Sequence, residues 1–332
     1  MKKGIYFCHQ DAWERVYQGR NAQKLQELLD CPAMVLTREN WREHADWLQD
    51  VEVIVSSWGG PIVDEKFLEL APNLKLYLYG AGSIKGLMSD AAWERGVRIT
   101  SAYAANAVPV AEFTLSQILF CLKNGWQLSR RSHDGESELW GVDKPVIGAF
   151  GAKVGIISLG MIGKKVCEFL KPFDVDVLVS SSYGSPDLER ELGVRVTSVE
   201  EIFKTCDCVS LHSPLLPSTQ GMITAAHFRS MKHGASFINT ARGAVVREDE
   251  MIEVLCERPD LTAVLDVTDP EPPHSESPLL SLPNVVLTPH LAGAFGNECQ
   301  RLGDYMLDEL GRYLQGAPLR WEIRADKAAV LA

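Results

Sequence analysis

Between residues 153 and 288 the chain repeats one pattern, in which a short apolar run is followed by a helical or turn-rich stretch. We expect strands at 153–158, 175–179, 208–211, 235–239, 262–267 and 284–288. Apolar runs that do not alternate with polar residues are typical of strands buried on both faces. The pattern therefore predicts a doubly wound α/β fold, with a parallel sheet and helices on both of its faces.

The sequence on either side of this region is less regular. Strands are expected at 4–8, 51–56 and 74–78, and helices at 22–29, 104–124 and 299–314. The segment 125–153 is rich in charge, Gly and Ser and is interpreted as a connecting stretch. The polar tail 320–327 carries no pattern that assigns it a structure.

The first expected strand of the repeat leads into the turn Ser158-Leu159-Gly160-Met161-Ile162-Gly163. It approximates G-x-G-x-x-G, with Ser158 in place of the first glycine. Gly160 would let the backbone approach a pyrophosphate, and Gly163 would let helix and strand pack closely. The phosphates would lie at the helix N-terminus, beside Met161 and Ile162. An ordinary βα turn is the alternative, but the position at the head of a βα series favours a dinucleotide-binding Rossmann domain.

The residue that would choose between NAD and NADP is unusual. Ser181 follows the second strand, where Asp or Glu normally binds the ribose 2′-hydroxyl, and no Arg or Lys follows directly to bind a 2′-phosphate. We expect NAD(H) or NADP(H) as cofactor, with a slight preference for NAD(H).

Three segments with reactive side chains follow the later strands: Asn239-Thr240-Ala241-Arg242-Gly243, Asp266–Pro273 and Thr288–Gly293. The carboxyl ends of parallel strands share one edge, so these segments would meet in one crevice. Arg242 offers a two-pronged fork for a carboxylate. His290 can exchange a proton near neutral pH, and Glu271 would orient its ring and stabilise the imidazolium. Singly, each is better explained as a surface ion-pair or loop residue.

Taken in order, these segments resemble the D-isomer-specific 2-hydroxyacid dehydrogenases, whose patterns N-T-x-R-G, D-V-x-x-x-E-P and T-P-H recur here at similar spacing. The resemblance includes Val110-Ala111-Glu112, Leu211–Leu215 and Ser277–Leu280 and extends over most of residues 50–315. It implies catalytic roles for Arg242, Glu271 and His290.

The resemblance also implies ligand contacts. Asp266 would meet the nicotinamide amide, and the backbone of residues 79–83 would hold the substrate carboxylate together with Arg242 and His290. The expected cofactor contacts are Ser158, Gly160, Met161, Ile162, Gly163, Ser181, His212, Ser213, Pro214, Thr240, Ala241, Asp266 and Gly293; the expected substrate contacts include Ala81 and Gly82. A structural role explains His212, Ser213 and Glu112 nearly as well, and core packing is the more common explanation for at least one of Trp58 and Tyr79.

The order of the motifs implies that the cofactor domain, residues 105–294, is inserted into a smaller flavodoxin-like α/β substrate domain, residues 1–104 plus 295–332. Helices near 105–123 and 296–314 would make the crossings, and domain closure would exclude water from the hydride path. The resemblance also implies a homodimer.

Composition excludes several other partners. A net charge of −11 argues against nucleic acid and anionic membranes. No uninterrupted apolar stretch has membrane-spanning length, and the apolar run 4–8 is too short for a secretory signal. The eight cysteines are scattered, which is typical of reduced thiols in the cytoplasm, and no metal site is expected.

These observations favour an oxidoreductase that transfers hydride between NAD(P)H and a small 2-oxo acid, such as a glyoxylate- or hydroxypyruvate-like compound. One alternative is formate oxidation on the same scaffold, but there a glutamine usually partners the histidine, so Glu271 argues against it. Another is a nucleotide-sensing corepressor, which the triad alone does not exclude. The loop at 56–61 gives no decisive sign of the substrate.

Overall fold

The computed structural model describes residues 1–135, 146–182 and 184–328. The chain divides into two compact units, one of residues 1–106 with the described residues from 294 onward, and one of residues 107–293. These bounds lie within two residues of the domain limits expected from the sequence.

The first unit contains a sheet in the order β14-β6-β5-β4-β1-β2, with β3 also paired to β1. Its strands are β1 (Lys2–Phe7), β2 (Leu29–Asp30), β3 (Val35–Leu36), β4 (Val53–Ser56), β5 (Leu76–Tyr79), β6 (Arg98–Ser101) and β14 (Glu322–Ile323). Neighbouring strands are parallel except β14 and β6. The order β2-β1-β4-β5-β6 is the 2-1-3-4-5 order of flavodoxin, which confirms the expected fold class.

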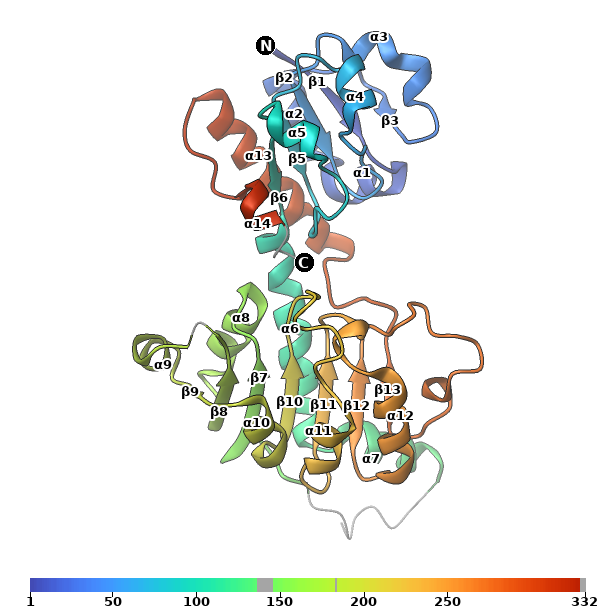
Figure 1. Cartoon of the computed structure of the whole chain (residues 1–332), viewed down its shortest axis with the longest axis vertical. Coiled ribbons are helices and arrows are strands. Elements are labelled where there is room, and N and C mark those ends of the chain that lie inside the picture. The colour runs from blue at the N-terminus through green and yellow to red at the C-terminus, as the bar shows by residue number, and fades with distance from the viewer. Residues whose placement is uncertain (136–145, 183, 329–332) are drawn as a thin grey trace. The chain divides into compact units, whose positions relative to one another are not determined.

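Helices cover both faces of this sheet. They are α1 (Gln10–Tyr17), α2 (Arg20–Leu28), α3 (Ala45–Leu48), α4 (Glu65–Leu70), α5 (Asp90–Glu94), α13 (Cys299–Leu314) and the terminal α14 (Ala325–Ala328). One core joins the sheet to α3, α4 and α5, and the other joins it to α1, α2 and α13. Figure 1 shows α13, close to the end of the chain, beside strands formed by the beginning of the chain.

The polar tail, which the sequence left unassigned, completes the edge of this sheet. β14 pairs antiparallel with β6, and the Arg98 guanidinium makes two hydrogen bonds to Glu322, at 2.7 and 2.8 Å. Glu309 of α13 is fully buried, and its carboxylate accepts hydrogen bonds from the backbone N–H groups of Arg320 and Trp321. These polar contacts with distant residues give the tail its structure.

The second unit contains a fully parallel sheet in the order β13-β12-β11-β10-β7-β8-β9. Its strands are β7 (Ala152–Ile157), β8 (Val175–Ser180), β9 (Arg195–Val196), β10 (Cys208–Leu211), β11 (Ser236–Asn239), β12 (Thr262–Leu265) and β13 (Val285–Leu287). All six expected strands are present, and the predicted Rossmann fold is confirmed. The strand order reverses between β7 and β10, and ligands of such sheets bind outside the carboxyl ends of the strands at that point.

Helices pack on both faces of this sheet as well. They are α6 (Tyr103–Leu122), α7 (Gly125–His133), α8 (Met161–Leu170), α9 (Pro186–Leu192), α10 (Val199–Thr205), α11 (Ala225–Ser230) and α12 (Glu248–Glu257). One core joins α10, α11 and α12 to the sheet, and a second joins α6, α8 and α9 to the opposite face (Figure 1). The successive β-strand side chains alternate between the two cores, as a doubly wound sheet requires.

The interpretation of 125–153 as a connecting stretch is wrong for its first part, because residues 125–133 form α7. The buried side chain of Gln127 anchors this helix by donating to the carbonyl of Leu261, at 3.1 Å, and to Oγ1 of Thr262, at 2.9 Å. Residues 136–145 of the same stretch lie outside the described part of the chain.

The expectation about membrane-spanning length also needs correction. By length and composition α6 is apolar enough to cross a membrane, but more than half of its most apolar part is buried within the structure. A mostly buried core helix passes the same test of length and composition, so α6 by itself indicates no membrane.

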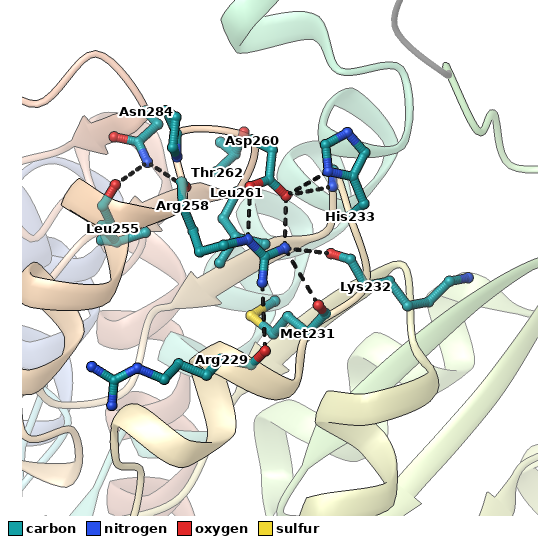
Figure 2. A network of polar contacts seen from close by, with 12 residues as sticks. Arg229, Met231, Lys232, His233, Leu255, Arg258, Asp260, Leu261, Thr262 and Asn284 are labelled. Carbon is teal, nitrogen blue, oxygen red and sulfur yellow. Dashed lines mark hydrogen bonds and ion pairs between the residues drawn. The ribbon is translucent and has the colours of Figure 1, made fainter.

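A polar network stabilises the amino-terminal edge of the second sheet, the edge opposite the expected site. Figure 2 shows Arg258 between Asp260 and the end of α11. Its guanidinium pairs with both carboxylate oxygens of Asp260, at 2.8 and 2.7 Å, and donates to the carbonyls of Met231 and Lys232. Met231 is the C-cap of α11 and Lys232 follows it, so Arg258 links the end of this helix to the loop before β12.

We predict that this network makes the stability of the protein depend on acid. The hydrogen-bonded Arg258, helped by the N–H group of Gly234, lowers the pKa of Asp260 to about 2. Because the folded-state pKa is depressed, the stabilisation is complete above about pH 4 and is lost as pH falls towards 2. Asp260→Asn should lower the free energy of unfolding by about 2 kcal/mol at pH 7. Urea unfolding at several pH values measures this, and Glu168→Gln, which alters an exposed pair with Lys165, should change it by less than about 0.5 kcal/mol.

Candidate active site

The turn after β7 holds its shape through Ser158 and Gly163. Ser158 has a φ of +79°, a left-handed conformation that favours glycine, the residue usual at this position of the motif. A Cβ on Gly163 would lie 2.1 Å from the Ser158 carbonyl oxygen, so only glycine allows α8 to pack this close to the turn. The motif therefore keeps its tight geometry although its first glycine is replaced.

The N-terminus of α8 fits a dinucleotide pyrophosphate. Gly160 is the N-cap, and a Cβ added there would meet no atom within 4 Å, so the space in front of the helix is open. Met161 begins the helix with 41% of its surface exposed, and Ile162 is half-buried. The unpaired N–H groups of the first helical turn and the helix dipole both favour an anion here.

Ser181 is the first residue after β8, at the end of the strand expected to contact the adenosine ribose. It offers no carboxylate to repel a 2′-phosphate and no cation to attract one.

We predict that the protein discriminates weakly between the two cofactors. The kcat/KM with NADH should exceed that with NADPH by much less than a thousandfold, since a thousandfold preference would correspond to roughly 4 kcal/mol. Steady-state assays with both cofactors measure the ratio, and a larger one would mean that another residue discriminates.

His212, Ser213 and Pro214 follow β10, beside the point where the strand order reverses. The His212 amide donates to the carbonyl of Ile157, the last residue of β7, at 2.9 Å. His212 and Ser213 are buried, and burial lowers the pKa of His212 to about 3, so its ring is neutral. The segment thus borders the same turn as Ser158.

Asn239 shapes the turn that carries Thr240, Ala241 and Arg242. Its Oδ1 accepts from the Ala241 N–H group at 3.0 Å, and its Nδ2 donates to the Arg242 carbonyl at 3.1 Å. A Cβ on Gly243 would lie 2.1 Å from the Thr268 backbone, so glycine lets this turn approach the loop after β12. Sequence reasoning assigned no role to Asn239 or Gly243, although both belong to the N-T-x-R-G pattern.

Asp266 organises the loop that carries His290. The buried carboxylate accepts from the Thr288 hydroxyl at 2.6 Å and from the N–H groups of Leu291 and Ala292 at 2.8 and 2.9 Å. The Asp266 carbonyl accepts from the His290 N–H group at 3.0 Å. Asp266 therefore holds residues 288–292 in place, and its contact with nicotinamide stays a prediction.

His290 and Glu271 form a pair at this edge. His290 Nδ1 lies 2.6 Å from Glu271 Oε1, and both side chains are partly exposed. His290 has a φ of +52°, an uncommon conformation for a residue with a side chain and one that recurs at active sites. The second unit thus brings together the two side chains that the sequence paired.

The negative charge of Glu271 also acts on the guanidinium of Arg242. Burial lowers the pKa of its guanidinium, and the negative charge of Glu271 opposes that effect. Its Nη1 donates to the Ala241 carbonyl at 2.6 Å. A half-buried cation whose charge interacts with the carboxylate of a histidine–carboxylate pair is suited to bind a small anionic substrate.

The remaining expected residues are divided between the two units. Gly293 ends the loop held by Asp266, in the second unit. Ala81 and Gly82 follow β5 in the first unit, where the Ser101 hydroxyl binds both of their carbonyl groups. Tyr79 is buried in the core of that unit, and Trp58 is half-buried with the Arg15 guanidinium 5.3 Å from its ring centre.

Comparison with known proteins agrees with this arrangement. Residues 115–292 match the NAD-binding domain of the D-isomer specific 2-hydroxyacid dehydrogenases. Similar relatives include the glyoxylate reductase of Korarchaeum cryptofilum, 30% identical over 81% of each chain. The D-3-phosphoglycerate dehydrogenase of Archaeoglobus fulgidus is 28% identical over 78% of this chain, which spans only 49% of the length of that relative.

Among solved structures, the TT0316 protein of Thermus thermophilus superposes with a TM-score of 0.76 at 26% identity, covering 96% of this chain and 99% of the other. The sequence match to the NAD-binding domain extends over more than half of the chain, and the structural likeness extends over nearly all of it. The chain therefore belongs to the D-isomer specific 2-hydroxyacid dehydrogenases, a family of NAD-binding oxidoreductases.

Proposed function

We propose that this protein reduces a small 2-oxo acid to the D-2-hydroxy acid with NADH, with His290 as the proton donor and Arg242 as the carboxylate-binding residue. The observation that carries the proposal is the 2.6 Å contact of His290 with Glu271, whose charge also acts on the half-buried Arg242. These groups supply the proton and the positive charge that reduction of a 2-oxo acid requires.

The geometry suggests how the side chains divide the work. When bound, the nicotinamide supplies the hydride that is added to the substrate carbonyl carbon. Because His290 Nδ1 faces Glu271, Nε2 is the ring nitrogen left to give its proton to the carbonyl oxygen. Glu271 holds the ring in that orientation. The Arg242 guanidinium binds the substrate carboxylate and so keeps the substrate carbonyl close to the nicotinamide and to His290 Nε2.

The substrate class is tested directly with a panel of 2-oxo acids. We propose glyoxylate- or hydroxypyruvate-like compounds, in keeping with the names of relatives such as the Korarchaeum cryptofilum glyoxylate reductase. Purified protein should oxidise NADH with at least one member of the panel and make the D-hydroxy acid, as chiral chromatography would show. If NADH binds but no 2-oxo acid is reduced, the proposed reaction is wrong.

The contribution of Glu271 should appear in the rate of reduction. Glu271→Ala removes the carboxylate that holds the His290 ring at Nδ1, so kcat should fall in both directions, whereas the Kd of NADH should stay within a few fold. Glu271→Gln keeps a hydrogen-bonding group at this place and should lose less activity. An unchanged kcat in Glu271→Ala would show that Glu271 is not the partner of His290, and Asp269 would be the next residue to test.

We also propose that the protein is a homodimer, which the family resemblance implies. Four exposed apolar side chains support it, with Phe150 86% exposed and Phe120 41% exposed, followed by Val146 and Ile147. The Gly148 N–H group donates to the Leu122 carbonyl, which places this segment beside the end of α6. Contiguous exposed apolar residues mark interaction surfaces. Light scattering of the wild type and of Phe150→Asp tests the proposal, because a dimer through this surface should weaken in the variant.

The thiols are consistent with a reducing compartment, and we propose a cytoplasmic location. All eight cysteines are free, and six of them are buried. Disulfides are rare where glutathione keeps thiols reduced. Fractionation of the native cell, probed with an antibody to this chain, tests the location.

A further inference from the structure

One polar atom near the cofactor turn lacks a partner. His212 Nδ1 is buried and has no hydrogen bond among the residues that the structure describes. His227, in the same unit, is different, because its Nδ1 accepts from the Thr224 N–H group at 3.1 Å. Leaving a buried donor or acceptor unpaired is costly, so the orphan nitrogen points to a missing partner.

The other ring nitrogen shows what that partner can be. His212 Nε2 lies 3.0 Å from the Ser210 hydroxyl, two residues earlier on the same face of β10. A neutral imidazole carries one N–H group and one acceptor nitrogen. If the Ser210 hydroxyl donates to Nε2, the proton is on Nδ1, and the orphan atom is a donor that needs an oxygen acceptor.

The position of His212 limits where that oxygen can be. β8 and β10 lie on opposite sides of β7, and the turn from β7 leads to the N-terminus of α8. The end of β8 is where a Rossmann fold binds the adenosine ribose. His212, at the end of β10, is therefore on the nicotinamide side of the pyrophosphate.

We propose that His212 is a positioning residue that donates a hydrogen bond from Nδ1 to an oxygen of the dinucleotide on its nicotinamide side, either the phosphate or the ribose, and that Ser210 selects the required tautomer. This inference rests on the NAD(H) binding of the proposed function. The proposal gives His212 a defined hydrogen bond to the dinucleotide, whereas the sequence indicated only that His212 borders the cofactor site.

The test measures ligand binding and does not depend on turnover. Tryptophan fluorescence or calorimetry gives the Kd of NADH, ADP-ribose, ADP and AMP for the wild type and for His212→Leu. The variant should bind NADH and ADP-ribose about tenfold more weakly, the effect of one buried hydrogen bond. A similar loss for ADP assigns the contact to the phosphate, whereas unchanged ADP binding assigns it to the ribose. An equal loss for AMP would overturn the proposal, because AMP has neither group.

Conservative variants separate this role from a structural one. His212→Asn places an amide N–H group close to the position of Nδ1 and should restore NADH affinity to within about threefold of the wild type. Ser210→Ala should weaken NADH binding by a smaller factor than His212→Leu, because the tautomer is no longer selected. His227→Asn is the matched control and should bind NADH like the wild type.

Thermal unfolding without ligand completes the experiment. His212→Leu also removes the Nε2 contact with Ser210, so the informative quantity is the rise in Tm that NADH causes, which should be smaller in the variant than in the wild type. A lower ligand-free Tm with unchanged NADH affinity would mean that His212 is only structural. If the wild type itself did not bind NADH, the proposed function would fail, whereas equal binding by wild type and variant would refute only the role of His212.

Discussion

Replacing His290 with Asn should lower kcat for 2-oxo acid reduction by about 10²–10⁴, the usual contribution of a positioned acid or base. Asn is the better replacement because His290 has a φ of +52°, and Asn adopts left-handed backbone more readily than Ala. It cannot donate a proton at neutral pH. The affinity for NADH should stay within a few fold, so the loss should appear in single-turnover rates measured at saturating NADH.

The control for this variant is His274→Ala. His274 is exposed and three residues from Glu271 in sequence, so a general effect of removing a nearby imidazole would appear there too. We expect wild-type kcat for this control. Near-normal turnover in His290→Asn would rule out His290 as the proton donor.

Replacing Arg242 with Gln should reduce kcat/KM for 2-oxo acids by about 10²–10⁴, because two charge-assisted hydrogen bonds of roughly 1.5–3 kcal/mol each are lost. Arg242→Lys keeps the charge but not the planar fork, and its loss should be smaller. The ratio of the two losses separates the charge of Arg242 from its geometry. Initial rates over a range of substrate concentrations give both values.

Arg242 also donates to the Ala241 carbonyl, so a disturbed turn has to be distinguished from lost substrate binding. The NADH Kd makes this distinction, since Thr240 and Ala241 are expected cofactor contacts. Arg247→Gln, which changes an exposed arginine paired with Glu250, is the matched control. Unchanged kcat/KM in Arg242→Gln would assign the carboxylate to another cation.

Apolar periodicity was sufficient to predict the second sheet. Six of its strands are largely buried, so each of these is visible as an apolar run such as Val154–Ile157, whereas the short edge strand β9, which is not fully buried, was missed. β6 was missed because Arg98, Thr100 and Ser101 interrupt the apolar character, and the buried hydroxyls are satisfied by partners distant in sequence. α7 was also missed because a polar side chain holds it in place: the buried Gln127 donates hydrogen bonds to Leu261 and Thr262, which are distant in sequence.

The candidate site was predictable as a location but not in its internal contacts. Carboxyl ends of parallel strands meet at one edge, which is why Glu271 and His290 could be paired from sequence. The left-handed backbone of Ser158 and His290, and the orphan Nδ1 of His212, depend on tertiary contacts that no local pattern encodes.

The place of α13 in the first unit has a consequence for synthesis on the ribosome. Leu302, Met306 and Leu310 cover one face of a sheet whose strands, apart from β14, all emerge within the first 106 residues. Residues 107–298 must be translated in between, which takes roughly 10–40 s at about 5–20 residues per second. During that interval the nascent first unit exposes an apolar face, while the inserted unit can already fold. A chaperone that shields this face should therefore increase the yield of native protein, and a circular permutant that begins at residue 294, in which α13 is translated just before β1, should need it less.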